Sequence, residues 1–355
     1  MASQRSNPND PADDLTATPP DDPPQHIFRW DLDKTYLDTD FDTFGDLIRT
    51  FLQKPEDKVN VPGADALLRE LLRREGRHQR LVTFISGSPR QMRRVLEEKL
   101  RLDGIEPDYF ILKPNLRNLL RGRFRALRGQ IGYKLKALLT IRLKTPVAPE
   151  TLFGDDAEQD ALIYCLYDDI VAGRVGRAHV AEILEAARVY PDVIAQILQL
   201  IRDNRLVPSV SRIFINLNRH TPTATFNPYG PRLVPIHNYF QAALILFADQ
   251  TLPATPILRI ALDMNQRHRY TPAMLANSFQ DLIRRRRLDP AAAESLAQAL
   301  REAPRPDAAV PSGLRPGALI EEFTSRLEAI SDRRAAPLLS DMGVPDYHAL
   351  VKAHV

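Results

Sequence analysis

The sequence lacks the features that mark secreted, disulfide-stabilised or membrane-spanning proteins. Its 355 residues include one cysteine, Cys165, which excludes an intramolecular disulfide and any cysteine-based zinc site. No apolar run approaches the roughly 18 residues that a membrane span needs. The first 25 residues contain no apolar core of the kind that a secretory signal requires. Their Pro, Asp and Thr content is typical of disorder. We therefore expect a cytoplasmic protein with a disordered leader at residues 1–25.

Strong net charge and clustered histidines are also missing. The net charge is +3, and the eight His residues are scattered without the spacing of metal ligands. A hydrophobic content of 44% and a charged content of 26% are those of a soluble globular protein. The length predicts two domains, or one enlarged α/β domain with an appendage.

What the sequence does contain is an alternation of strand and helix patterns. Short apolar, β-rich runs predict strands near residues 26–30, 80–89, 108–112 and 151–155. Apolar residues at helical spacing predict helices at 44–52, 64–75, 90–102 and 161–171. Further strands are expected at 211–216 and 231–236, followed by a helix at 237–250. Such alternation predicts an α/β fold, a parallel sheet with helices on both faces.

Polar side chains stand at the ends of three of these strands. Asp31 and Asp33 follow the first strand two residues apart, so both can project to the same side. Ser86 ends the second strand, and three carboxylates follow the fourth: Asp155, Asp156 and Asp160. Taken alone, the first pair also fits a solvated turn or a helix cap. Because the carboxyl ends of parallel strands share one edge, we expect these side chains to converge.

Four separated segments together resemble the haloacid dehalogenase-like phosphohydrolases. The first motif of that superfamily is similar to Asp31-Leu32-Asp33-Lys34-Thr35, and the second, a strand ending in Ser or Thr, to the strand at Ser86. The third is a lysine at or near a helix start, here Lys134, with Lys136 as its rival. The fourth is similar to Gly154-Asp155 with Asp160.

Within the superfamily, residues 25–250 most resemble the catalytic domain of the actin-patch phosphatidate phosphatase family. The segments that carry this likeness are Ser86-Gly87-Ser88-Pro89, Tyr133-Lys134-Leu135 and Gly154-Asp155 to Asp160. Three features depart from the family pattern. Lys34 replaces an aspartate, Asp156-Ala157 replaces Ser-Gly, and a helical stretch at about 178–205 looks inserted.

The resemblance implies a domain organisation. A Rossmannoid phosphatase domain with a minimal cap would occupy residues 26–250, and the helical patterns of residues 251–355 would form a C-terminal region of unknown role. A Pro-rich stretch at 303–317 is expected to be a linker or long loop within it.

The resemblance also implies a chemistry, hydrolysis of a phosphomonoester through an aspartyl-phosphate with Mg²⁺ as cofactor. Asp31 would be the nucleophile, and Asp33 the general acid and base. The metal would be held by Asp31, the carbonyl of Asp33 and Asp155, with Asp160 and Asp156 behind them. The substrate phosphate would be bound by four residues: Thr35, Ser86, Gly87 and Lys134. Simpler readings stay open, that Ser86 and Ser88 merely cap the helix that Pro89 begins, and that Asp156 is a helix cap.

A basic segment gives the one indication of a partner besides a phosphorylated substrate. Residues 113–149 contain ten Lys or Arg and no Asp or Glu. A basic amphipathic helix within 113–144 favours peripheral contact with an anionic membrane surface. Nucleic acid phosphates and a solvated face on a core helix are the alternatives. A phosphatidate-like lipid is the leading substrate class. The alternatives are a soluble metabolite, a nucleic acid end, and a non-catalytic module that only binds.

Overall fold

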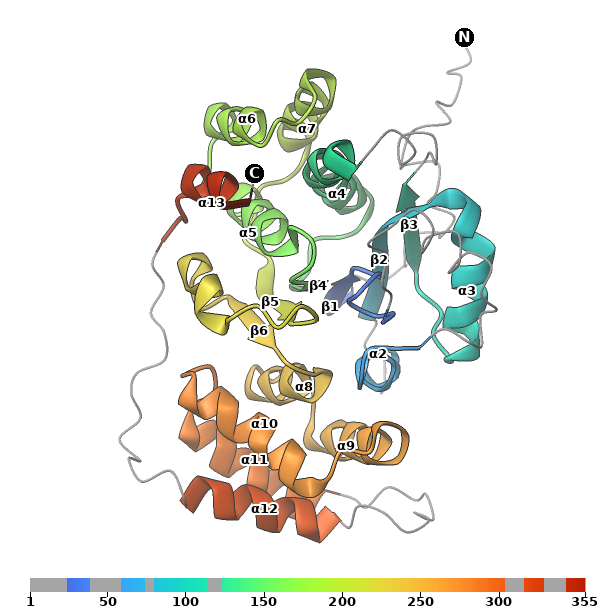
Figure 1. Ribbon diagram of the computed structural model, residues 1–355, viewed down its shortest axis with the longest axis vertical. Helices are drawn as coiled ribbons and strands as arrows, with labels where there is room; N and C mark the ends of the chain where they lie inside the picture. The colour runs from blue at the N-terminus through green and yellow to red at the C-terminus, as the bar shows by residue number, and fades with distance from the viewer. Residues whose placement is uncertain are drawn as a thin grey trace.

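The architecture was examined in a computed structural model of the chain (Figure 1). The structure describes residues 24–38, 59–73, 80–113, 123–303, 316–328 and 343–354, without the side chains of 123–129, 290, 316, 323, 324, 327, 328 and 354. Most of the expected leader, the helix predicted at 44–52, and most of the expected linker lie outside the described residues. So does the stretch 114–122 of the basic segment.

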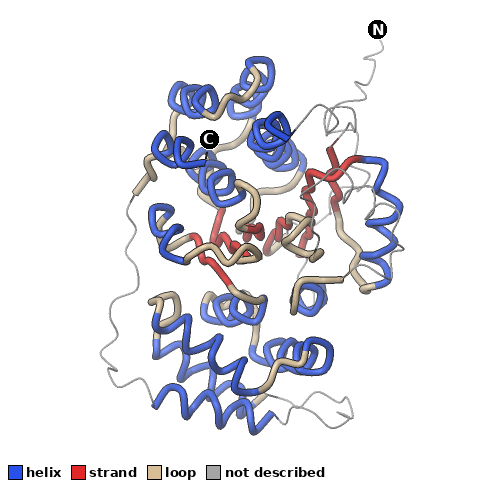
Figure 2. The backbone as a smooth tube through the Cα atoms, in the orientation of Figure 1, coloured by secondary structure: helices blue, strands red, loops and turns tan. Residues whose placement is uncertain are grey.

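Six parallel strands form one sheet in the middle of the molecule (Figure 2). They are β1 (His26–Trp30), β2 (Arg80–Pro89), β3 (Tyr109–Lys113), β4 (Glu150–Asp155), β5 (Val210–Asn216) and β6 (Leu233–Ile236). Their order is β3-β2-β1-β4-β5-β6, and every pairing is parallel. The predicted α/β fold is thereby confirmed. Strands β2 and β3 are added on one side of β1 and strands β4, β5 and β6 on the other, so the strand order reverses between β1 and β4, where open α/β sheets place their ligands.

Alternate residues of β1 face two separate hydrophobic cores. Phe28 and Trp30 point to one core, and Ile27 to the other. Trp30 is stacked on Phe153 at 3.9 Å between ring centroids, and Tyr239 lies 5.2 Å from it. Both faces of β1 are therefore buried, as the unbroken run His26–Trp30 requires in a central parallel strand.

Helices cover both faces of the sheet (Figure 1). On the Trp30 side lie α2 (Ala64–Leu72), α3 (Arg93–Leu102) and α8 (Tyr239–Ala248). On the opposite side lie α4 (Arg123–Lys144), α5 (Asp160–Val171), α6 (Arg177–Ala186) and α7 (Pro191–Asp203). Short 3-10 turns, η3 (Arg90–Met92) and η5 (Thr223–Tyr229), join some of these elements. Helices α6 and α7 fill the segment between α5 and β5, where the sequence predicts a helical insertion.

The C-terminal region is helical, as predicted. It comprises α9 (Ala254–His268), α10 (Pro272–Arg284), α11 (Pro290–Glu302), α12 (Pro316–Glu328) and α13 (Tyr347–His354). The first four stack beyond α8, whereas α13 lies against α5 and α6 on the other side of the sheet (Figure 1). The hydroxyl of Tyr347 donates a hydrogen bond there to Asp169. The division into domains, including the minimal cap, stays a prediction. Among the helices that the structure describes, none is both long and apolar enough to span a bilayer.

Candidate active site

Lys134 is the centre of a buried cluster of carboxylates at the carboxyl edge of the sheet. Its side chain is fully buried, with 0% exposure. Its Nζ lies 2.7 Å from Asp31 Oδ1, 2.6 Å from Glu158 Oε2 and 2.5 Å from Asp160 Oδ1. The ammonium donates hydrogen bonds to Glu158 and Asp160 and forms an ion pair with Asp31. The ends of β1 and β4 are thus tied to α4 through one lysine.

Asp31 directly follows β1 and is held from two sides. Its backbone N–H donates to the carbonyl of Phe153 in the neighbouring strand at 2.8 Å. The hydroxyl of Thr35 donates to Asp31 Oδ2 at 3.2 Å and lies 3.5 Å from Asp155 Oδ2. Thr35 itself is fixed by the Tyr239 hydroxyl, which donates to its carbonyl at 2.6 Å. The loop after β1 therefore fixes the orientation of the Asp31 carboxylate.

Asp33 faces the end of β2. Its Oδ2 accepts a hydrogen bond from Ser86 Oγ at 2.9 Å and another from Ser88 Oγ at 2.7 Å. Its other oxygen, Oδ1, is buried and has no hydrogen-bond partner among the residues that the structure describes. Ser88 does not cap the following helix, because its side chain is turned to Asp33 and Pro89 occupies the cap position. One serine was predicted to reach this site, and two do.

The loop after β4 folds tightly around Asp155. Its Oδ1 accepts hydrogen bonds from the backbone N–H groups of Ala157 at 2.5 Å and Glu158 at 3.0 Å. Asp160 begins α5 and accepts from the Asp155 N–H at 3.3 Å. A Cβ added to Gly154 would come within 2.5 Å of Asp160 Oδ2. Only glycine at this position lets Asp160 reach Lys134.

Burial sets the electrostatics of these carboxylates. It raises the pKa of Asp31 and Asp155 well above the usual range, with Lys134 opposing the shift. Burial likewise raises the pKa of Asp160 to about 6, again against Lys134. For Glu158 the ammonium of Lys134 prevails over burial, and its pKa is lowered. Burial alone would lower the pKa of Lys134, but its three carboxylate partners raise it. The cluster therefore holds more negative charge than its surroundings readily stabilise.

The same cluster fits a hard divalent cation. Four residues each offer one oxygen, all within 4.8 Å of one another: Asp31, Asp155, Glu158 and Asp160. Against these four carboxylates stand the ammonium of Lys134 and that of Lys34, which acts electrostatically on Glu158. Two negative charges remain when all are ionised, and one divalent cation would offset them. A set made only of carboxylate oxygens is the kind that Mg²⁺ prefers.

Of the other predicted site residues, Gly87 lies beside this cluster and Asp156 lies outside it. Gly87 lies at its border, since an added Cβ would be 3.5 Å from Nε2 of Gln130, which hydrogen-bonds Glu158. The carboxylate of Asp156 is not part of the group. It accepts hydrogen bonds from the backbone N–H groups of Arg219 at 2.8 Å and Thr221 at 3.0 Å. Nor does it cap α5, whose cap position is Gln159. Asp156 instead anchors the loop that follows β5.

Two further details correct the sequence interpretation. Lys134 lies in the middle of α4, not near its start. Its rival Lys136 is half-buried, and two residues of helix turn it about 200° away. Glu158 had no predicted role, although it stands between Asp155 and Asp160 in an acidic loop. That position was the only sign in the sequence of its contact with Lys134.

Lys34, the residue that departs from the family motif, is nearly buried. Its backbone has φ 60°, in the left-handed region, which costs a non-glycine residue free energy. Its carbonyl accepts a hydrogen bond from Asn216 Nδ2 at 3.1 Å, which ties the loop to the end of β5. Its charge lowers the pKa of Glu158 after the larger effect of Lys134. The lysine and the glutamate therefore compensate each other at the edge of the cluster.

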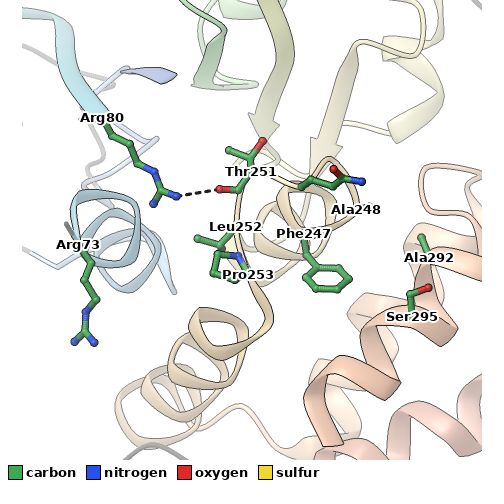
Figure 3. Close-up of a pocket in the computed structure, with 10 residues that line it drawn as sticks. Arg73, Arg80, Phe247, Ala248, Thr251, Leu252, Pro253, Ala292 and Ser295 are labelled. Atoms are coloured by element: carbon green, nitrogen blue, oxygen red, sulfur yellow. Dashed lines mark hydrogen bonds between the residues drawn. The ribbon is translucent and has the colours of Figure 1, made fainter. Parts of the chain in front are cut away.

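A cavity of about 610 Å³ lies away from these groups, at the amino edge of the sheet (Figure 3). It is bordered by Arg73 at the end of α2 and Arg80 at the start of β2, with Phe247 and Leu252 opposite. Arg80 donates to the carbonyls of Leu71 at 3.4 Å and Thr251 at 3.2 Å. This arginine thus closes the contact between β2 and the C-terminal region. None of the predicted site residues lines the cavity.

One comparison with known proteins bears on this site. Residues 30–179 match the family model described as "Phosphatidate phosphatase APP1, catalytic domain". The match runs from the end of β1 into α6, so it includes Asp31, Lys134 and Asp160, whereas β5 and the C-terminal helices lie beyond it. The resemblance predicted from the motifs is confirmed over these residues. Searches of curated proteins and of solved structures gave no match.

Proposed function

From the match of residues 30–179 to this family, we propose that this chain is a Mg²⁺-dependent phosphomonoester hydrolase acting on phosphatidate-like lipids through an aspartyl-phosphate. The observation that carries the proposal is the convergence of Asp31, Asp33, Ser86, Lys134 and Asp155 at the carboxyl ends of β1, β2 and β4. Such a reaction needs a nucleophile, a general acid and base, hydrogen-bond donors to the phosphate, and metal ligands.

Asp31 is the proposed nucleophile. One of its oxygens pairs with Lys134 and the other accepts the Thr35 hydroxyl, so the carboxylate is held in a single orientation. A carboxylate attacks a phosphate dianion only where positive charge offsets the repulsion between them. Lys134 supplies part of that charge. When bound by Asp31, Asp155 and the carbonyl of Asp33, Mg²⁺ would supply the rest.

Asp33 is the proposed acid and base. The hydroxyls of Ser86 and Ser88 both donate to Oδ2. Oδ1 has no hydrogen-bond partner among the described residues, so this oxygen is available to carry a proton. Burial raises the pKa of Asp33, against the opposing hydrogen bond of Ser88, and this favours the protonated form that a general acid requires.

The proposed reaction has two steps, formation of the aspartyl-phosphate and its hydrolysis. An oxygen of Asp31 bonds to phosphorus, the ester P–O bond breaks, and the leaving oxygen takes the proton of Asp33. In the second step Asp33 removes a proton from water, the water oxygen bonds to phosphorus, and the bond to Asp31 breaks. Inorganic phosphate is released, and both carboxyl groups return to their starting forms.

The phosphate would be held by Thr35, Ser86, the N–H of Gly87 and Lys134. Lys134 donates hydrogen bonds to Glu158 and Asp160 and is paired with Asp31, so it must leave one of these carboxylates to bind the substrate phosphate. Glu158 is the candidate, because its side chain is 24% exposed whereas Asp31 and Asp160 are buried. Peripheral binding of an anionic membrane through residues 113–144 is part of the same proposal, but Lys134 and Arg142 are buried and make none of that contact.

The proposal is tested with two substrates, p-nitrophenyl phosphate and vesicles containing phosphatidate. We expect Mg²⁺-dependent release of phosphate from both, and loss of both activities in Asp31→Asn. Asp192→Asn, which changes an exposed carboxylate on α7 in the same way, should keep them. Hydrolysis of the soluble ester without binding or hydrolysis of the vesicles would contradict the lipid assignment. If neither substrate released phosphate, the proposal that the chain is a phosphatase would be wrong.

A further inference from the structure

A second group of ligand-type side chains lies between α2 and α9, apart from the carboxylates around Lys134. It consists of Asp65 from α2 with Asp263 and His268 from α9. Each offers one ligand atom, and these atoms lie within 4.8 Å of one another. Asp263 and His268 lie outside the family match at 30–179.

Three polar atoms in this group are buried without a hydrogen-bond partner in the described structure. They are Asp65 Oδ1, Asp263 Oδ2 and His268 Nε2. The Asp65 side chain is 0% exposed. An unpartnered carboxylate oxygen in such a place is unfavourable, and a native structure usually contains something that satisfies it.

The neighbouring arginines explain why one oxygen of each carboxylate is left over. Arg69 donates to Asp65 Oδ2 at 2.9 Å and to Asp263 Oδ1 at 2.8 Å. Arg267 pairs with the same two oxygens. Both guanidinium groups therefore lie on one side of the carboxylate pair. The opposite oxygens, with the His268 imidazole, are left to a further partner.

We propose that Asp65, Asp263 and His268 bind a Zn²⁺ ion that joins α2 to the C-terminal helices. Two carboxylates and one imidazole are a donor set of the kind zinc accepts, with water in a fourth position. Bonds of about 2.0–2.1 Å separate tetrahedral ligands by about 3.4 Å, so the group needs to contract by little more than an ångström.

The type of ligand distinguishes zinc from harder ions here. Two arginines already neutralise the two carboxylates, so net charge does not separate Zn²⁺ from Mg²⁺ or Ca²⁺. A nitrogen ligand favours Zn²⁺ over those ions on chemical grounds.

The backbone around the group brings α2 and α9 into close contact. Gly63 precedes α2 with φ 82°, and an added Cβ would come within 2.9 Å of Met264 Sδ. Asp65 and Asp263 are thus placed by backbone packing and not by flexible loops, as a metal site requires. Bound zinc would link the phosphatase-like part to a region that otherwise has no assigned role.

The test measures zinc uptake by the EDTA-treated full-length chain, using calorimetry and metal analysis after gel filtration. Every protein in the comparison carries Asp155→Asn, which weakens metal uptake around Lys134. The chain with this change alone is called the parent. The parent chain should bind one equivalent of Zn²⁺ more than its His268→Ala derivative. Zinc should raise its melting temperature by several degrees, as a ligand specific to the folded state does. The derivative should show no such rise.

His220→Asn is the matched control, since it removes an exposed imidazole at a position with φ 56° that asparagine tolerates. It should bind zinc as the parent does. Asp263→Asn tests a second ligand in case His268→Ala fails to fold. Equal zinc uptake and equal melting shifts in the parent and both ligand variants would overturn the proposal. Phosphatase activity is not the readout, so this result is separable from failure of the proposed function.

Discussion

Gly154→Ala is expected to separate catalysis from folding at the carboxylate cluster. The added methyl group would lie 2.5 Å from Asp160 Oδ2 and 2.6 Å from its Cβ. Ordinary contacts begin near 3.4 Å, so Asp160 must retreat by about 1 Å. Rotating the carboxylate gives no relief, because the Cβ is also in the way. The start of α5 must therefore move.

The magnitude follows from that displacement. Overpacking of a buried site typically costs about 1–3 kcal/mol, which most domains survive, since their stability is about 5–15 kcal/mol. The 2.5 Å contact between Asp160 and Lys134 would lengthen. Lys134 would then no longer be held in its place beside Asp31. A misplacement of about 1 Å can lower kcat by about 100-fold. Activity should thus fall far more than stability.

The assay is turnover of p-nitrophenyl phosphate with Mg²⁺, combined with urea unfolding. Gly176→Ala is the matched control, because nothing lies within 4 Å of its added Cβ and its φ of −77° suits alanine. It should keep both activity and stability. If Gly154→Ala turned over substrate as fast as Gly176→Ala, the inferred dependence of the site on Asp160 would be wrong.

Three further predictions concern other parts of the chain. Burial of the His26 imidazole lowers its pKa from 6.5 to about 4, so the folded state is destabilised as pH falls from 6.5 to 4, by at most about 3 kcal/mol. His26→Gln should flatten that part of the unfolding curve. Ser88→Ala should lower kcat several-fold with little change in KM, because Asp33 keeps only one of its two hydroxyl donors. Tyr347→Phe should lower the unfolding free energy by about 1–2 kcal/mol, since it removes the hydroxyl that donates to Asp169. The first prediction is wrong if the unfolding free energy of the wild type does not change between pH 6.5 and 4. The second is wrong if Ser88→Ala keeps the wild-type kcat, and the third if Tyr347→Phe keeps the wild-type urea midpoint.

Much of the fold follows from local patterns. The runs at His26–Trp30 and Arg80–Pro89 are apolar and bounded by polar residues, and alternation with helices requires parallel pairing. The convergence of Asp31 with Lys134 and Asp155 also follows, because motif order places each on one edge of the sheet. Helix bounds are less well predicted. The helix expected at 90–102 begins with the turn η3, and Lys134 lies deeper in its helix than expected.

What the sequence could not predict depends on the direction of side chains in loops. Beyond a strand end, alternation no longer fixes which way a residue points. Asp156 therefore binds the amides of Arg219 and Thr221, while Glu158, two residues later, reaches Lys134. The group of Asp65, Asp263 and His268 was hidden for another reason. Asp65 lies about 200 residues before Asp263 and His268, and only the packing of α2 on α9 brings it to them.

The most direct test of the central claim is to locate the phosphoryl group on the chain. Trypsin should release residues 30–34 as one peptide, because Arg29 and Lys34 flank it. Asp33→Asn should slow hydrolysis of the intermediate, so this variant is mixed with p-nitrophenyl phosphate and Mg²⁺ and quenched in acid. We expect the peptide to carry one phosphoryl group, which fragmentation places on Asp31. A peptide without that mass, from protein that still releases p-nitrophenol, or a phosphoryl group on another residue, would contradict the account.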